Sequence, residues 1–313
     1  MAQTNERARH GGLIPWSDDL AQRHGRCWSP AAARRYCTGL LRDSDRSAGL
    51  WLRPLPTERA AALAALAAVD AVADALSAES PDDRTRAACL DGWAAAVEAC
   101  PGGRAAHPAL SALGQAAQDC ALDTAPLAAA VRARRALEAR PAIASWCELE
   151  SLERPVAGPL GRLAAQVLGM DRPPLVQRAE RLSLAWRWTA RWCRLSDALA
   201  RGRVLLPHEA LERHAVSPHD LLAGRQSPAT HALIRSAAAR TRVLYREATP
   251  LALEAGLPAA LPVVRLWLGG RSLLHLVAEA GAAVLRRRPV LTPPLFMRTL
   301  AQAGWSRLVG RAA

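Results

Sequence analysis

Long runs of alanine and leucine, with no strand-like segments between them, constrain this fold more than any other feature. The clearest run is AAALAALAAVDAVADAL, which follows the residues Leu-Pro-Thr-Glu-Arg. Alanine, leucine and arginine are among the strongest helix formers, whereas runs of valine, isoleucine and threonine, which typify strands, are hard to find. The sequence therefore predicts an all-α protein. Its 313 residues suffice to bury a substantial core without disulfides or metals.

Proline and glycine punctuate the apolar segments and predict about ten helices in one unit. We expect Thr57 to cap the helix that carries the alanine-rich run, and Ser80 to cap the next helix. The absence of internal repeats and of composition shifts predicts one domain over residues 31–313, after a flexible tail of residues 1–30. The expected helices cover residues 31–41, 57–76, about 81–100, 107–120, 124–139, 145–153, 156–169, 174–200, 208–213, 228–254, 259–287 and 293–308.

The formal charge is +13, and every basic side chain other than histidine is arginine. Arginine stays charged and grips phosphate through two nitrogens at once. The charge therefore favours an anionic partner, such as a diphosphate, an acidic membrane surface or nucleic acid.

Cysteine usage and the chain termini bear on the compartment. The seven cysteines are scattered and form no CxxC pair, which argues against a disulfide framework or a zinc site and for a reducing compartment. The first residues contain no apolar signal-peptide core. The apolar segment 261–285 is interrupted by Arg265, Arg271, His275 and Glu279, too often for a simple spanning helix. We expect a cytoplasmic protein, with peripheral contact to the inner membrane face as a further expectation.

Six segments occur in an order that resembles the squalene/phytoene synthase family of head-to-head prenyl transferases. They are SAGLWLRPLP, VDAVAD, HPALSAL, ERPVAGPLG, the stretch from AWRWTARWC to RGRVLLP, and VLRRRPVLT. The residues that match the family pattern are Ser47, Arg53, Leu55, Pro56, Asp70, Asp74, Val156, Ala157, Gly158, Gly161, Ala185, Thr189, Gly202, Arg203, Leu206 and Pro207.

The resemblance implies a single-domain isoprenoid synthase (terpenoid synthase-like) fold, a helical bundle around a central cavity. It also implies a magnesium-dependent condensation of two isoprenyl diphosphates. Magnesium prefers carboxylate oxygens, and aspartates at i and i+4 lie on one helical face. The resemblance therefore makes Asp70, Asp74 and Asp197 the candidate metal ligands. It makes Ser47, Arg53, Arg194 and Arg203 the candidate substrate-binding residues.

The sequence departs from the family pattern where the chemistry takes place. In the second aspartate-rich segment, Arg187 stands at the family's glutamine and Ala190 at its asparagine. Arg194 and Ala198 stand at its two aspartates, and Asp197 stands at its glutamate. The family's tyrosines before Val-Ala-Gly are also absent, and Leu152, Arg154 and Pro155 stand there. A cation about 4 Å from a metal site costs roughly 4 kcal/mol per unit charge at an effective dielectric near 20. Arg194 would therefore oppose magnesium, unless it grips phosphate itself or pairs with Asp197 or Asp70.

Structural explanations compete with these assignments. Asp70 and Asp74 can be polar residues of an ordinary helix, and Asp197 with Arg194 a surface pair. RGRVLLP can be a helix end with Gly202 at the C′ position. We expect the indoles of residues 186, 188 and 192 to pack in a core rather than line a pocket.

Three functions follow, in order of preference. The first is a catalytically degenerate family member that binds an isoprenoid, a lipid or a partner protein. The second is an active magnesium-dependent prenyl transferase of the squalene or phytoene type. The third is a charge-driven binder of nucleic acid or a membrane surface. It ranks last because the arginines are spread along the chain, and nucleic acid is the least favoured partner.

Overall fold

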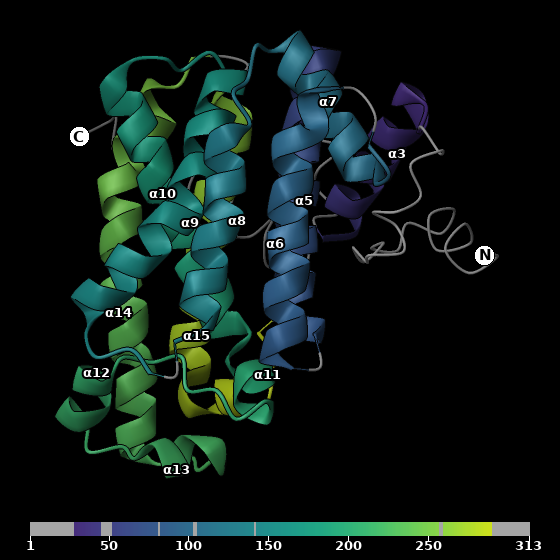
Figure 1. Ribbon diagram of the computed structural model, residues 1–313. Coiled ribbons are helices and arrows are strands. Elements are labelled where there is room, and N and C mark those ends of the chain that lie inside the picture. Colours follow the sequence, from purple (N-terminus) through teal and green to yellow (C-terminus); the bar gives the residue numbers. More distant parts are fainter. Residues whose placement is uncertain are drawn as a thin grey trace, which may run out of the picture. The chain divides into compact units, whose positions relative to one another are not determined.

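The computed structural model describes residues 28–44, 52–80, 82–102, 105–140, 142–256 and 259–289, and these form helices without a strand (Figure 1). The all-α prediction is therefore confirmed. In chain order the elements are α3 (Pro30–Ser44), α5 (Thr57–Glu79), α6 (Asp83–Ala99), the 3-10 turn η1 (Cys100–Gly102), α7 (Pro108–Asp119), α8 (Ala125–Glu138), α9 (Trp146–Val167), α10 (Pro173–Cys193), α11 (Leu195–Ala200), α12 (His208–Arg213), α13 (Pro218–Leu222), α14 (Pro228–Glu254), α15 (Ala260–Ala280) and the 3-10 turn η2 (Gly281–Leu285).

The contacts divide the chain into two compact units. Unit 1 comprises Met1–Arg140, Leu152–Glu180 and Gly256–Leu261, and unit 2 comprises Pro141–Ser151, Arg181–Ala255 and Pro262–Ala313. Each unit is assembled from separate segments, so neither corresponds to one continuous stretch of sequence. Residues 1–27 of the expected tail lie outside the described residues. The helix expected at 293–308 also lies outside them.

Unit 1 is built around the alanine-rich helix α5, which packs against α3, α6, α7 and α8. Most of the buried side chains of this helix are alanines, and such small side chains let neighbouring helices approach closely. The same helix has the length and apolar composition of a membrane span, with a window of mean hydropathy 1.7 that is 50% buried inside the protein. A core helix has this composition for the same reason, because its apolar faces contact other helices.

The caps of the first core helices differ from expectation. Asp82, not Ser80, caps α6, and its carboxylate accepts hydrogen bonds from the backbone and hydroxyl of Thr85, both at 2.8 Å. The Ser80 hydroxyl instead donates to the carbonyl of Leu76 at the end of α5, at 2.6 Å. Thr57 is the first residue of its helix, where the N-cap position belongs to Pro56.

Tryptophans form the core of unit 2. The rings of Trp146, Trp188 and Trp192 lie 5.7 to 6.3 Å apart, and the last two are 1% exposed. The Trp192 indole donates to the hydroxyl of Thr241 on α14 at 2.8 Å. The expected core role is therefore confirmed for Trp188 and Trp192, whereas Trp186 is half-buried.

Two helices differ in extent from their expected ranges. The segments expected as 145–153 and 156–169 form one helix, α9, which continues through Pro155 and Pro159. Each proline removes one backbone hydrogen bond of the helix, because proline has no backbone N–H. Tertiary packing of the remaining residues keeps the helix intact. The helix expected at 174–200 is interrupted at Arg194, whose backbone φ of −100° and ψ of 16° separate α10 from α11.

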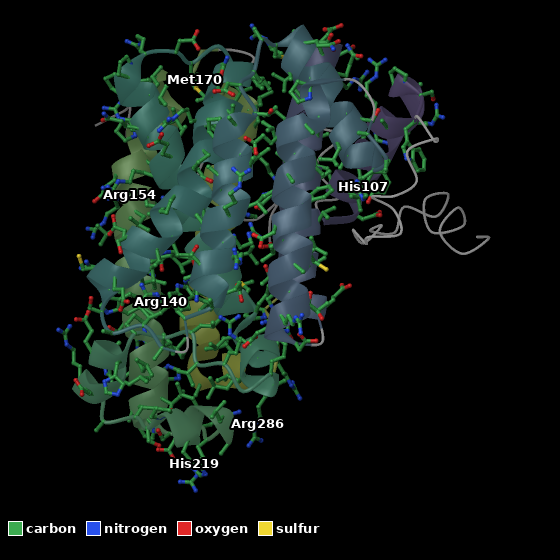
Figure 2. All side chains as sticks on the ribbon, in the orientation of Figure 1. His107, Arg140, Arg154, Met170, His219 and Arg286 are labelled. Atoms are coloured by element: carbon green, nitrogen blue, oxygen red, sulfur yellow. The ribbon has the colours of Figure 1, made fainter. Side chains whose placement is uncertain are left out.

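The ends of two unit 2 helices are held by hydrogen bonds, one set local and one between distant residues. Gly202 has a φ of +74°, and the amides of Gly202 and Arg203 donate to the carbonyls of Leu199 and Ala198, both at 2.9 Å. This is a Schellman motif, and the expected C′ role of Gly202 is confirmed. After η2, the Arg286 side chain donates to the carbonyl of Gly224 at 3.2 Å, and Figure 2 shows this arginine near α13.

Candidate functional site

Two carboxylates of α5 share one guanidinium of α8. Asp70 and Asp74 lie one helical turn apart, and Arg134 forms an ion pair with each of them through a different terminal nitrogen. The Arg134 side chain is 2% exposed, while those of Asp70 and Asp74 are 33% and 26% exposed. All three residues belong to unit 1. Charge-assisted hydrogen bonds of this kind are about twice as strong as neutral ones.

Arg134 reaches the carboxylates because it lies on the inward face of α8. Leu127, Ala130 and Val131 precede it by seven, four and three residues, the spacing of one helical face, and all are buried. Arg135, the next residue, turns toward α6 and pairs with Asp91 at 3.1 Å, with half of its side chain exposed. One position on the apolar face is thus occupied by a cation.

A small hollow lies beside this ion pair. The hollow beside it measures about 10 Å³ and is lined by Val69, Asp70, Leu127, Ala130, Val131, Arg134 and Val156. A hollow of that size holds about one water molecule. The hollow itself is too small for a hydrated magnesium ion together with a diphosphate, since magnesium usually keeps several of its waters. The two carboxylates are also partly exposed to solvent outside it.

The donor set does not fit a magnesium ion in this arrangement. Both carboxylates already neutralise a buried guanidinium, and among the described residues no group of three or more His, Cys, Asp or Glu side chains could hold a metal. A divalent ion about 4 Å from the guanidinium would be repelled by roughly 8 kcal/mol at an effective dielectric near 20.

The other expected site residues that the structure describes belong to unit 2, apart from Arg53. Asp197 is exposed on α11 in unit 2, with one carboxylate oxygen 3.5 Å from the Ser196 hydroxyl. Arg194 and Arg203 are half-buried in the same unit, and Arg53 is exposed in unit 1. Ser47 lies outside the described residues.

The sequence interpretation did not include Arg134, which is the partner of Asp70 and Asp74 in the structure. For Arg194 it left open that the residue opposes a metal, grips phosphate, or pairs with Asp197 or Asp70, and these remain predictions. The signal that could have identified Arg134 is its position on the face marked by Leu127, Ala130 and Val131, because a cation at such a position needs a buried acidic partner.

Unit 2 contains a larger hollow between α9, α10 and α14. It measures about 250 Å³ and is lined by Glu150, Arg181, Trp188, Arg240, Val243, Leu244 and Glu247. Arg181 bridges the two glutamates, at 2.6 Å from Glu150 and 3.3 Å from Glu247. The two carboxylates thus share one guanidinium of the same unit.

The sequence profile of the squalene/phytoene synthase family matches residues 41–294, which is most of the chain. The chain belongs to this family. Over 92 residues it is 37% identical to the phytoene synthase of Thermus thermophilus. That match covers 29% of this chain and 32% of the relative, so it spans about a third of the curated protein's length.

Solved structures of similar proteins share the fold. The chain is similar to a dehydrosqualene synthase solved in complex with ligand, with a TM-score of 0.75 and 20% identity over 90% of this chain and 98% of that one. The squalene synthase HpnC from Alicyclobacillus acidocaldarius has a TM-score of 0.67 and 22% identity, over 80% of this chain and 95% of that one. YisP from Bacillus subtilis subsp. subtilis strain 168 has a TM-score of 0.64 and 16% identity, over 92% of this chain and 100% of that one.

These similarities confirm the isoprenoid synthase fold and relate the chain to isoprenoid biosynthesis. Members of the family bind isoprenyl diphosphates and are typically metal-dependent. In this member the carboxylates of the DxxxD pair form ion pairs with an arginine of the same chain.

Proposed function

We propose that this member of the squalene/phytoene synthase family has lost magnesium-dependent prenyl transfer. We further propose that it keeps the fold as a binder of an isoprenyl diphosphate or a related lipid. The observation that carries the proposal is the pairing of Arg134 with both Asp70 and Asp74. A lipid is favoured over a protein partner because the family binds isoprenyl diphosphates.

The lost chemistry depends on charge. Ionisation of an allylic diphosphate creates a strongly anionic leaving group, which divalent ions neutralise in metal-assisted catalysis. A guanidinium that is already paired with two carboxylates supplies no net positive charge for this purpose, since the trio carries a formal charge of −1. The second aspartate-rich segment supports the same conclusion, because Arg194 and Ala198 replace its aspartates.

An active transferase is the alternative, and one observation favours it. Asp70 and Asp74 keep the spacing of a metal-binding pair and remain about one third and one quarter exposed. Activity would require magnesium to displace Arg134 from both carboxylates, against the repulsion described above.

Incubation of the purified protein with labelled farnesyl and geranylgeranyl diphosphate, with and without magnesium, tests the proposal. We expect binding in a calorimetric titration but no magnesium-dependent release of diphosphate. Magnesium-dependent release that disappears in the Asp70→Asn variant would instead establish the active transferase.

Replacing Arg134 separates the metal question from activity. In Arg134→Met the two carboxylates lose their cation, and we expect magnesium to raise the melting temperature of the variant but not of the wild type. Ligand linkage gives about 1.4 kcal/mol when free magnesium exceeds its dissociation constant tenfold, which corresponds to a few degrees.

The matched control is Arg135→Met, which removes a neighbouring exposed arginine of the same helix. The Asp70→Asn change in the Arg134→Met background should abolish the magnesium effect. If magnesium stabilises the wild type as much as the variant, Arg134 does not block the site and the proposal is wrong.

A further inference from the structure

Three arginines form a straight stripe along α14. Arg235, Arg242 and Arg246 are exposed and separated by seven and four residues. An α-helix rotates by about 100° around its axis per residue. The three side chains therefore project within about 20° of one direction, and they form a line parallel to the helix axis. Leu253 continues the same line eighteen residues after Arg235, and its side chain is 65% exposed.

A fourth arginine joins the stripe from α15. The Trp267 indole donates to the carbonyl of Tyr245 on α14 at 3.0 Å, which brings the two helices together within unit 2. The Arg271 guanidinium lies 4.3 Å from the centre of the Trp267 ring. Burial, followed by the positive charge of Arg242, lowers the pKa of Arg271, which shows that Arg242 and Arg271 feel each other's charge. We call Arg235, Arg242, Arg246 and Arg271 the arginine stripe.

No acid neutralises the arginine stripe within the described part of the chain. None of its four members forms an ion pair there, whereas Arg181 of the same unit is paired with two glutamates. Glu247, the acid that directly follows Arg246, is one of those two and lines the hollow beside α10. Four like charges on one surface repel each other, so the stripe favours an anionic partner.

We propose that the arginine stripe, together with Leu253, docks this protein on an anionic lipid bilayer. From Arg235 to Leu253 the stripe is about 27 Å long at 1.5 Å per residue, so it can lie along a flat surface. Helices that bind membrane interfaces combine arginine with leucine in this way, since the cations attract anionic headgroups and the leucine enters the acyl boundary.

The exposed Leu253 favours a bilayer over nucleic acid as the partner, because a leucine can enter the acyl boundary. Proteins that bind single-stranded nucleic acid without sequence preference stack bases on aromatic rings. Here the ring of Trp267 is covered by Arg271. This inference concerns unit 2 only and does not depend on the proposed loss of catalysis.

Vesicle partitioning tests the inference. The probes are phosphatidylcholine vesicles with and without about 30 mol% phosphatidylserine, a composition that gives a negative surface potential. We expect the wild type to partition onto the anionic vesicles, with a steep fall as salt is raised. The stripe variant Arg242→Ser/Arg246→Ser/Arg271→Ser should lose at least about tenfold in partition coefficient, since each arginine near the surface contributes about fivefold.

The control removes three exposed arginines outside the stripe, in Arg84→Ser/Arg201→Ser/Arg213→Ser. Both triple variants change the formal charge from +13 to +10, because each removes three cations. We expect the control to lose less than about threefold. Leu253→Ser should weaken binding while leaving the salt dependence unchanged, because it removes an apolar contact and no charge.

Equal losses in the two triple variants would show binding by overall charge and overturn the proposal. If the stripe variant loses as much affinity for a soluble DNA duplex as for the anionic vesicles, the stripe is a general polyanion-binding surface. That result would overturn the lipid assignment. If the stripe variant melts below the assay temperature, the double variant Arg242→Gln/Arg246→Gln replaces it. We expect its partition coefficient to fall at least about fivefold. None of these outcomes bears on the Arg134 assays, which contain no membrane.

Discussion

At the scale of single residues, Arg134 is the partner of the first aspartate-rich motif. A buried cation is costly unless partners compensate it, and Asp70 and Asp74 do so. Their DxxxD spacing is compatible with a metal site and with an arginine clamp. The local sequence of α5 therefore does not distinguish the two, and the proposed loss of the metal site rests on the residue supplied by α8.

Another buried polar contact offers a test of the unit 2 core. The Trp192 indole donates to the Thr241 hydroxyl within the core. Thr241→Val keeps the shape but leaves a buried N–H without an acceptor, so we expect a loss of about 1–3 kcal/mol in the free energy of unfolding. Denaturant unfolding measures this loss.

Thr249→Val is the matched control on the same helix. The Thr249 hydroxyl donates only to the carbonyl of Tyr245, one turn earlier, at 3.0 Å and with partial exposure. We expect this change to cost less than about 1 kcal/mol. Equal losses would mean that the indole finds another acceptor when Thr241 is removed.

At the scale of elements, the Val-Ala-Gly-x-x-Gly segment explains how α9 and α10 approach each other within unit 1. A Cβ atom added at Gly161 would lie 2.5 Å from the carbonyl oxygen of Ala179, which is backbone and cannot move aside alone. A Cβ atom at Gly158 would meet only the Glu180 side chain, at 3.9 Å. The second glycine is thus required for packing, and the first is not.

We therefore expect Gly161→Ala to destabilise the protein by about 1–3 kcal/mol, the usual cost of overpacking. Gly158→Ala should be neutral or stabilising by up to about 1 kcal/mol, since alanine favours the helix over glycine. Melting temperatures of the two variants provide the comparison. A Gly161→Ala variant as stable as the wild type would show that α9 and α10 separate more easily than this spacing indicates.

At the scale of the whole molecule, the cysteines offer one probe in each unit. Cys37 in unit 1 and Cys193 in unit 2 are 1% and 5% exposed, and burial raises the pKa of their thiols to about 12 and about 11. The thiolate is the reactive form. Alkylation of both should therefore be negligible at pH 8 until the protein unfolds, whereas the exposed Cys147 reacts at once.

The sign of the pH dependence follows from these raised pKa values. A thiol whose folded pKa exceeds that of the unfolded chain contributes stability that is fully present below the unfolded pKa, near about 8.5. This stability is lost progressively as the pH rises toward the folded pKa values of about 11 and about 12. Raising the pH from 8 to 10 should consequently destabilise the native protein. The same rise in pH accelerates alkylation of a free thiol, but it should not accelerate alkylation of Cys37 in the folded protein. Mass spectrometry of alkylated peptides checks both points. Labelling of Cys37 at the rate of Cys147 in the native protein would contradict the buried position.

The sequence by itself determined the helical class, the family and many of the helix limits. Alanine, leucine and arginine favour helix at almost every position, Gly202 sits where a helix end needs a positive φ, and the VAGPLG segment carries the spacing of the family. The two differences in α9 and α10 arise where tertiary packing overrode local preference, at Pro155 and at Arg194.

Only the tertiary structure decided which residue Asp70 and Asp74 contact. Their partner lies sixty or more positions away along the chain, and local periodicity predicts which face of a helix is buried but not which residue of a distant helix it will contact. An ion pair between two helices depends on their distance and rotation, which are set by the packing of the apolar side chains around them.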